Sequence, residues 1–129
     1  MRGARALVAA ARRARRRAHA PYSRFRVGAA VRAGGRTFVG ANVENASYGL
    51  TVCAERAAVL AAVLAGARRL GAVAIASGTT PPTPPCGMCL QTLAEFAGPD
   101  LPVLLAGPRA VQVTTLGALL PRGFSRRYL

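Results

Sequence analysis

Cys53-Ala54-Glu55-Arg56 and Pro85-Cys86-Gly87-Met88-Cys89 hold all three cysteines of this 129-residue chain. Two cysteines separated by two residues at the start of a helix place both sulfurs at one end of that helix, where they can bind one metal ion. The run from Cys53 to Leu64 is strongly helical in composition, so Cys53 is also predicted to lie at a helix N-terminus. The two stretches therefore predict a single metal site made by two helices.

The predicted metal site has three protein ligands, Cys53, Cys86 and Cys89. A helix N-terminus favours negative charge and lowers a thiol pKa, which suits thiolate ligands. Three ligands leave the fourth position of tetrahedral zinc open, and this is typical of catalytic sites. Glu55 lies two residues after Cys53 and can carry a proton from water to a substrate and its leaving group. Arg56 would offset part of the thiolate charge.

The rest of the sequence alternates predicted helices and strands. An amphipathic helix is expected over residues 2–20, with His19 at its end. A Gly34-Gly35 turn predicts a hairpin of strands 26–32 and 36–40. Further strands are expected at 71–77, 102–106 and 111–113, and helices at 53–64, at 87–96 and from a Thr114 or Thr115 cap to Leu120. This order predicts one domain over residues 1–129, a three-layer α/β/α fold with a mixed sheet of about five strands.

Asn42, Val43 and Glu44 follow the second predicted strand. In extended backbone alternate side chains point the same way, so Asn42 and Glu44 are expected on one face and Val43 in the core. An amide beside a carboxylate can donate to and accept from a sugar hydroxyl. An isolated Asn-x-Glu can equally serve as a turn.

The formal charge is +14, and all eighteen basic residues are arginine. A basic surface attracts nucleic acid, but the arginines are spread along the chain, so a solvated surface is the favoured interpretation and a nucleic-acid partner is not expected. No apolar run approaches the ~20 residues that span a bilayer. Because all three cysteines are assigned to one site, no disulfide framework is expected, and a cytoplasmic protein is predicted.

Two motifs resemble the zinc-dependent cytidine deaminase family. Cys53-Ala54-Glu55 followed by Pro85-Cys86-Gly87-Met88-Cys89 resembles its metal signature, and Pro21-Tyr22-Ser23 with Phe25 and Val27 to Ala30 resembles its opening segment. A ligand set of three cysteines resembles that of the small family members that act on free nucleosides. The resemblance implies one Zn²⁺ per subunit and hydrolytic deamination of cytidine and deoxycytidine in pyrimidine salvage. It also counts against reading the arginine-rich start as a cleaved transit peptide.

The resemblance also implies substrate contacts. Phe25 would pack against the pyrimidine, Asn42 and Glu44 would bind the ribose 3′-hydroxyl, and backbone at Ala54 would contact the base. Ala46 and Tyr48 would belong to the nucleoside pocket, and Phe124 would enter the active site of a neighbouring subunit in a homotetramer. Leu90 departs from the family pattern, which often has arginine after the second zinc cysteine of this motif.

Other readings of the same residues remain open. A structural zinc module would need a fourth ligand, and His19, the only histidine, is far from both motifs in sequence. A thioredoxin-like site would use Cys86 and Cys89 and leave Cys53 without a role. A deaminase of an aminonucleoside antibiotic of the blasticidin S type, or of cytosine in a polynucleotide, is a closer alternative. The low aromatic content disfavours the polynucleotide.

Overall fold

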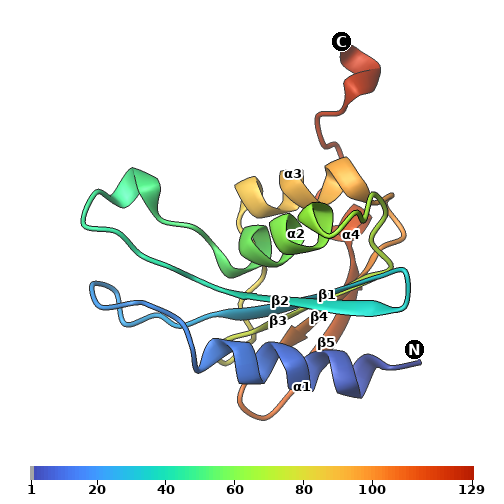
Figure 1. Ribbon diagram of the computed structural model, residues 1–129. Coiled ribbons are helices and arrows are strands. Elements are labelled where there is room, and N and C mark those ends of the chain that lie inside the picture. Colours follow the sequence, from blue (N-terminus) through green and yellow to red (C-terminus); the bar gives the residue numbers. More distant parts are fainter. Residues whose placement is uncertain (1) are drawn as a thin grey trace.

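A mixed sheet forms the middle layer of the computed structural model, which describes residues 2–129. Within these residues the sheet has five strands in the order β2-β1-β3-β4-β5 (Figure 1). The parallel pair is β3 with β4, and the other neighbouring strands are antiparallel. The strands are β1 (Gly28–Ala33), β2 (Arg36–Ala41), β3 (Ala72–Ala76), β4 (Pro102–Ala106) and β5 (Val111–Thr115).

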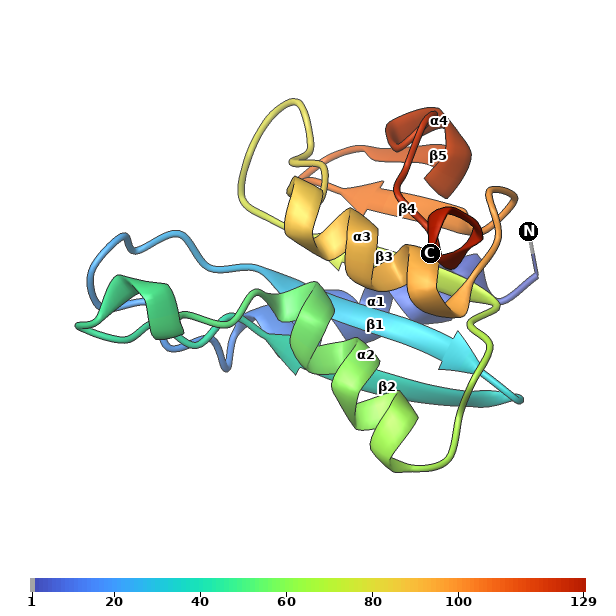
Figure 2. The ribbon, with the colours of Figure 1, turned by 90° about the horizontal axis from the view of Figure 1, so that it is seen from above.

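Helices cover both faces of this sheet. One face carries α1 (Ala4–Arg15), and the other carries α2 (Ala54–Leu64) and α3 (Gly87–Phe96), which lie side by side (Figures 1 and 2). The short α4 (Leu116–Leu119) follows β5, and single 3₁₀ turns occupy Tyr48–Leu50 and Arg126–Tyr128. The predicted three-layer α/β/α fold with a mixed sheet is therefore confirmed.

Each layer boundary has its own hydrophobic core. Val31, Val73, Ile75 and Val103 point from the sheet toward α2 and α3 and are almost fully buried. On the opposite face, the small residues Ala30, Ala72, Ala74 and Ala76 pack against Leu7 and Ala11 of α1. Side chains of adjacent strand residues point to opposite faces, so strands made almost entirely of apolar residues fill both cores at once.

Glycines act at the hairpin and at the entry to α2. Gly34 and Gly35 have φ of 57° and 78°, as the predicted two-residue turn requires. A Cβ on Gly40 of β2 would lie 2.5 Å from the backbone nitrogen of Ala58 and 2.6 Å from the carbonyl oxygen of Ala54. The missing side chain therefore lets the backbone of β2 approach the first two turns of α2 closely.

The first helix is shorter than its sequence pattern predicted. It ends at Arg15, and the next three backbone N–H groups bond to carbonyls only three residues back. His19 therefore does not end the helix. It lies in an extended segment, where its N–H donates to the Asn42 carbonyl and its carbonyl accepts from the Glu44 N–H. Pairing with this distant segment replaces helical bonds that the local pattern favoured.

The prediction for Val43 was wrong. Its side chain is 50% exposed, although Asn42 and Glu44 do share one face, as predicted. Val43 pairs through its backbone with both His19 and Val52, outside the five strands of the sheet, and its side chain belongs to neither hydrophobic core.

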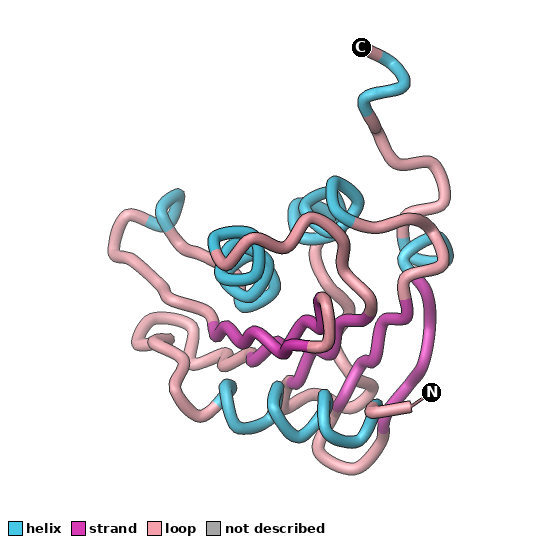
Figure 3. The backbone as a smooth tube through the Cα atoms, turned by 45° about the vertical axis from the view of Figure 1, so that its right-hand side comes forward, coloured by secondary structure: helices cyan, strands magenta, loops and turns pink. Residues whose placement is uncertain are grey.

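The remaining elements agree closely with the predicted ranges. The bounds of α3 and β4 are those predicted, β5 is two residues longer, and Thr115 caps α4 by accepting a hydrogen bond from the Ala118 N–H at 3.2 Å. The chain beyond α4 leaves the body of the domain and projects away from it (Figure 3). Within residues 2–129, no helix combines the length and apolar composition needed to cross a membrane.

Candidate active site

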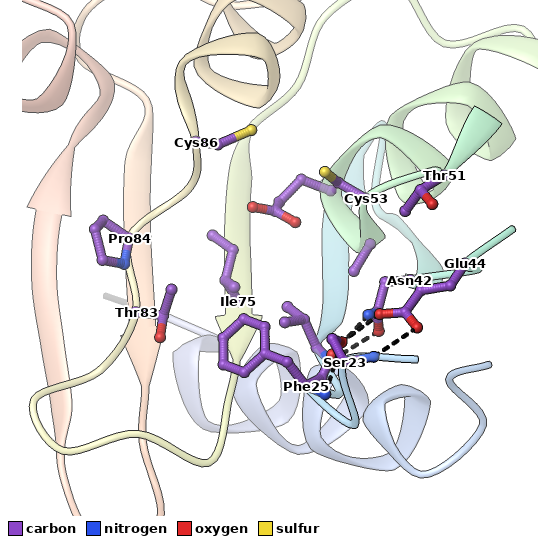
Figure 4. Close-up of a pocket in the computed structure, with 13 residues that line it drawn as sticks. Ser23, Phe25, Asn42, Glu44, Thr51, Cys53, Ile75, Thr83, Pro84 and Cys86 are labelled. Carbon is purple, nitrogen blue, oxygen red and sulfur yellow. Dashed lines mark hydrogen bonds between the residues drawn. The ribbon is translucent and has the colours of Figure 1, made fainter. Parts of the chain in front are cut away.

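The three cysteines meet where α2 and α3 begin. Cys53 is the N-cap residue of α2, Cys86 is the N-cap residue of α3, and Cys89 lies in the first turn of α3. Their sulfur atoms all lie within 4.8 Å of one another, and the three thiols are free. Figure 4 shows the Cys53 and Cys86 side chains facing the space between the two helices. The sequence prediction of one three-cysteine metal centre is confirmed.

The thiols differ in their electrostatic surroundings. The pKa of Cys53 is lowered, first because the Cys89 thiol donates a hydrogen bond to its sulfur and then because of Arg56. Arg56 Nη2 lies 3.8 Å from Cys53 Sγ and donates to the Thr51 carbonyl at 3.0 Å. The pKa of Cys89 is raised by its hydrogen bond to Cys53 and by burial. A negative charge is thus favoured at Cys53 even without a metal.

Glu55 lies next to the thiol cluster in the first turn of α2. Its side chain is only 5% exposed, which is unusual for a carboxylate, and it lines a pocket. Burial raises the pKa of Glu55 above the ordinary value for a glutamic acid, and the neighbouring Cys53 thiolate adds to this effect. A carboxyl group whose pKa is raised in this way is a better proton acceptor than an exposed one and can return the proton later.

The pocket runs from the thiols to the segment before β1 and the segment after β2, and its volume is about 260 Å³. The Phe25 ring points into it, near Ile75 and Thr83 (Figure 4). The lining residues come from five segments of the chain: Ser23, Phe25, Val27, Asn42, Glu44, Thr51, Cys53, Ala54, Glu55, Ile75, Thr83, Pro84 and Cys86.

Asn42 is a buried member of the pocket wall, 8% exposed. Its Oδ1 accepts a hydrogen bond from the Val27 N–H at 2.9 Å, and its Nδ2 donates to the Phe25 carbonyl at 2.7 Å. Both ends of the amide therefore bond to the backbone on either side of Arg26. A buried polar side chain bonded in this way fixes the path of that segment.

Glu44 organises the turn that precedes Phe25. Its Oε1 accepts hydrogen bonds from the N–H groups of Tyr22 and Ser23 at 2.9 and 3.1 Å, and its Oε2 accepts one from the Ser23 hydroxyl. These bonds, above all that of the Ser23 hydroxyl, lower the pKa of Glu44. The group is thus held as an ionised acceptor at the end of the pocket opposite the thiols.

Three predicted substrate residues lie outside this pocket. Ala46 and Tyr48 are in the projecting loop between β2 and α2, where Tyr48 is 73% exposed. Phe124 is in the projecting tail, 57% exposed, and its ring stacks on Tyr128 with centroids 5.8 Å apart. One chain does not bring these three residues to the pocket, and their role remains a prediction.

Sequence reasoning missed several pocket residues. Ser23 belonged to a quoted motif, but its bond to Glu44 spans 21 positions. Ile75 was assigned only to the predicted strand 71–77, and Thr83 and Pro84 lie in the proline-rich segment before Cys86, to which no role in the pocket was given. Prolines next to a metal-binding cysteine restrict the backbone there, and this could have indicated that the segment forms part of the pocket wall. No local pattern singles out Thr51 or Ile75.

The donor set fits zinc. Thiolates are ligands that select zinc and other soft ions over magnesium or calcium, and three of them leave one tetrahedral position open. Arg56 Nε, beside the thiols, is buried with no hydrogen-bond partner among the described residues, so a cationic group already faces the anionic ligand set. Together, the α/β/α fold, the three thiols and the buried Glu55 define a zinc-dependent hydrolase of nucleobase-type substrates.

Known proteins make the assignment specific. Residues 1–105 match the model of the cytidine and deoxycytidylate deaminase zinc-binding region. The chain is 42% identical to a cytidine deaminase of Sporosarcina psychrophila, over 95% of this chain and 92% of the relative. It is 46% identical to one of Halalkalibacterium halodurans, over 92% of each chain.

Solved structures agree with this result. A crystal structure of a cytidine deaminase from Burkholderia pseudomallei has a TM-score of 0.90 at 47% identity, over 94% of this chain and 98% of that one. That of Mycobacterium tuberculosis has a TM-score of 0.82 at 43% identity, over 94% and 96%. The chain belongs to the cytidine deaminase family.

Proposed function

We propose that this protein catalyses the hydrolytic deamination of cytidine and deoxycytidine to uridine and deoxyuridine, with release of ammonia. The observation that carries the proposal is one pocket with two chemically distinct ends. Three thiols and the buried Glu55 form one end, and the ionised Glu44 with Asn42 forms the other. The apolar wall that includes Phe25 and Ile75 suits a flat base. Residues 1–129 would act as one catalytic domain.

Cys53, Cys86 and Cys89 would hold the zinc ion, which supplies the activation of the attacking water. Arg56, at 3.8 Å from Cys53 Sγ, limits the negative charge that three thiolates place at this end. The N-termini of α2 and α3 contribute in the same sense, because their free N–H groups favour negative charge.

Glu55 would carry the protons of the reaction. It takes one proton from the water and delivers it to N3 of the pyrimidine as the oxygen forms its bond to C4. Glu55 then takes the remaining proton from the new hydroxyl at C4 and delivers it to the amino group, so that the carbon–nitrogen bond breaks, ammonia leaves and the C4 carbonyl forms. The raised pKa of Glu55 suits this role, because the same group must accept and donate within one cycle.

The other end of the pocket would recognise the sugar. Glu44 is held as an acceptor by donors on its outer side, and Asn42 fixes the neighbouring backbone. Figure 4 shows the Phe25 ring on another side of the pocket, near Ile75 and Thr83, where it would pack on the base. Backbone at Ala54 would contact the polar edge of the base.

The functional unit would be a homotetramer. Leu60 and Leu64 on α2, and Met88 on α3, are exposed on the face that is turned away from the sheet. Tyr48 and Phe124 are also exposed, and the segments that contain them, the loop between β2 and α2 and the tail after α4, project from the domain (Figure 1). An assembly that buries these residues would bring Phe124 of one subunit to another subunit's pocket. Light scattering coupled to size exclusion would give the subunit number.

The proposed setting is pyrimidine salvage in the cytoplasm. Its support is chemical, because three free thiols that serve one metal site are best preserved in a reducing compartment. The substrate would be a free nucleoside rather than a polynucleotide.

A panel of substrates tests the proposal. Purified protein of known zinc content is given cytidine, deoxycytidine, cytosine and a cytosine-containing oligonucleotide, and the loss of ultraviolet absorbance is checked against ammonia release. Rapid conversion of the two nucleosides alone is the expected result. Zinc-loaded protein that leaves both nucleosides untouched would reject the proposal in favour of an aminonucleoside antibiotic or a polynucleotide.

A further inference from the structure

We propose that Ser23 is a positioning residue, which directs Glu44 Oε2 at a single sugar hydroxyl and ties it to the turn that carries Phe25. This inference rests on the proposed function and adds a residue to which neither the family motifs nor the catalytic steps give a role. Ser23 lines the pocket, and its hydrogen bonds there join it to Glu44 and to the Phe25 N–H.

The acceptor sites of Glu44 are almost all used. A carboxylate has about four lone-pair positions. Oε1 accepts two backbone N–H groups, from Tyr22 and Ser23, and Oε2 accepts the Ser23 hydroxyl. One position on Oε2 is left, on a group that lines the pocket. The carboxylate can therefore accept one further hydroxyl, and only where Ser23 leaves room for it.

The direction of the Ser23 hydroxyl is fixed by its second bond. Its Oγ accepts the Phe25 N–H at 2.9 Å, so the single hydroxyl proton points toward Glu44. The result is an ordered chain from the Phe25 N–H through Ser23 Oγ to Glu44 Oε2. Hydrogen bonds arranged in sequence polarise and strengthen one another. Glu44 cannot turn without breaking this chain.

The same hydroxyl closes a strained turn. Arg24 has φ of 59°, the left-handed backbone region that a residue other than glycine rarely adopts. Its N–H donates to the Ala20 carbonyl at 2.9 Å, and the Ser23-to-Phe25 bond closes the other side. Strain of this kind persists only where the surroundings enforce it. The Glu44 acceptor and the Phe25 ring are thus held as one unit.

A Ser23 hydroxyl that only stabilised the turn would have a different effect on substrate preference when removed. If the hydroxyl only closed the turn, its loss would disturb Phe25 and weaken every pyrimidine substrate to the same degree. If it also aims Oε2, its loss must weaken substrates with the sugar hydroxyl more than those without it. A comparison of substrates that differ by this one hydroxyl separates the two roles.

The test compares deoxycytidine with 2′,3′-dideoxycytidine in wild type, Ser23→Ala and Ser23→Thr. We expect Ser23→Ala to lower kcat/KM for deoxycytidine about tenfold, mainly through KM, since a hydrogen bond to a charged group is weakened. For dideoxycytidine the loss in kcat/KM should stay below about threefold. Ser23→Thr keeps the hydroxyl, so this variant should regain the wild-type ratio of kcat/KM between deoxycytidine and dideoxycytidine. Thr37→Ala, which removes an exposed hydroxyl on β2, is the matched control.

Binding of the same two nucleosides in a Glu55→Gln background, measured by calorimetry, gives a second readout that does not need turnover. Absence of turnover in the wild type would reject the proposed function. An equal loss for both nucleosides on Ser23→Ala, in kcat/KM and in Kd, would overturn the role of Ser23.

Discussion

The two ends of the pocket are built in opposite ways. At the metal end, Cys53 and Cys86 are the N-cap residues of two helices that pack on the sheet, and Glu55 lies in the first turn of one of them. At the sugar end, Asn42 and Glu44 hold the loops together through their own hydrogen bonds. The side chains at the metal end are therefore not needed to hold the backbone in place and can bind metal and carry protons. Those at the sugar end must both stabilise the loops and bind the ligand. Substitutions at the two ends should differ accordingly.

The largest effect is expected from Cys86→Ala. The variant should lose bound zinc and with it detectable turnover, because two thiols cannot hold the ion as three do. The unfolding free energy of its metal-free form should remain within about 0.5 kcal/mol of that of metal-free wild type, because Cys86 is exposed. Zinc analysis and urea unfolding measure the two quantities. A metal-free variant that is much less stable would show that the metal end also supports the fold.

Glu55→Ala is expected to separate metal binding from chemistry. The variant should keep one zinc ion per chain while kcat falls about 10³-fold, the usual contribution of a positioned proton carrier. Glu95→Ala, which removes an exposed carboxylate from α3, is the matched control. Substantial turnover by the Glu55 variant would refute its role as the proton carrier.

Asn42→Ala should affect both the stability of the fold and the binding of nucleosides. The change leaves the Val27 N–H and the Phe25 carbonyl without their partner, so the free energy of unfolding should fall by about 2 kcal/mol. KM for nucleosides should rise as well, because Phe25 loses its support. Asn42→Asp keeps the acceptor for Val27 and should recover part of the stability. Equal stability of wild type and Asn42→Ala in urea would remove the contrast between the two ends.

The metal end was predicted from sequence far better than the sugar end, and the reason is the range of the interactions. Cys86 and Cys89 are separated by two residues on one helix, so their spacing alone predicts a shared ligand. Ser23 and Glu44 meet only because the β1–β2 hairpin returns the chain to the 21–25 turn, and His19 leaves its helix for the same segment. No local periodicity encodes these contacts.

The smallest effect is expected from arginines in and next to α1, which lie at neither end of the pocket. Arg13 in α1 and Arg16, the residue that ends it, are exposed, and α1 covers the face of the sheet opposite α2 and α3 (Figure 1). Replacing both by alanine should change kcat/KM for deoxycytidine less than about twofold, because solvated charges away from a site contribute little. Steady-state kinetics at two salt concentrations would measure this. A larger loss would connect the basic surface to substrate capture.

Zinc titration tests the central claim most directly. Protein stripped of metal under reducing conditions is given zinc in steps, and deoxycytidine turnover is followed at each step. We expect no turnover without zinc, a linear return, and a plateau at one ion per chain, with Cys86→Ala unresponsive. Turnover that persists in the zinc-free protein, or that does not follow zinc occupancy, would contradict a deaminase built on the three thiols of α2 and α3.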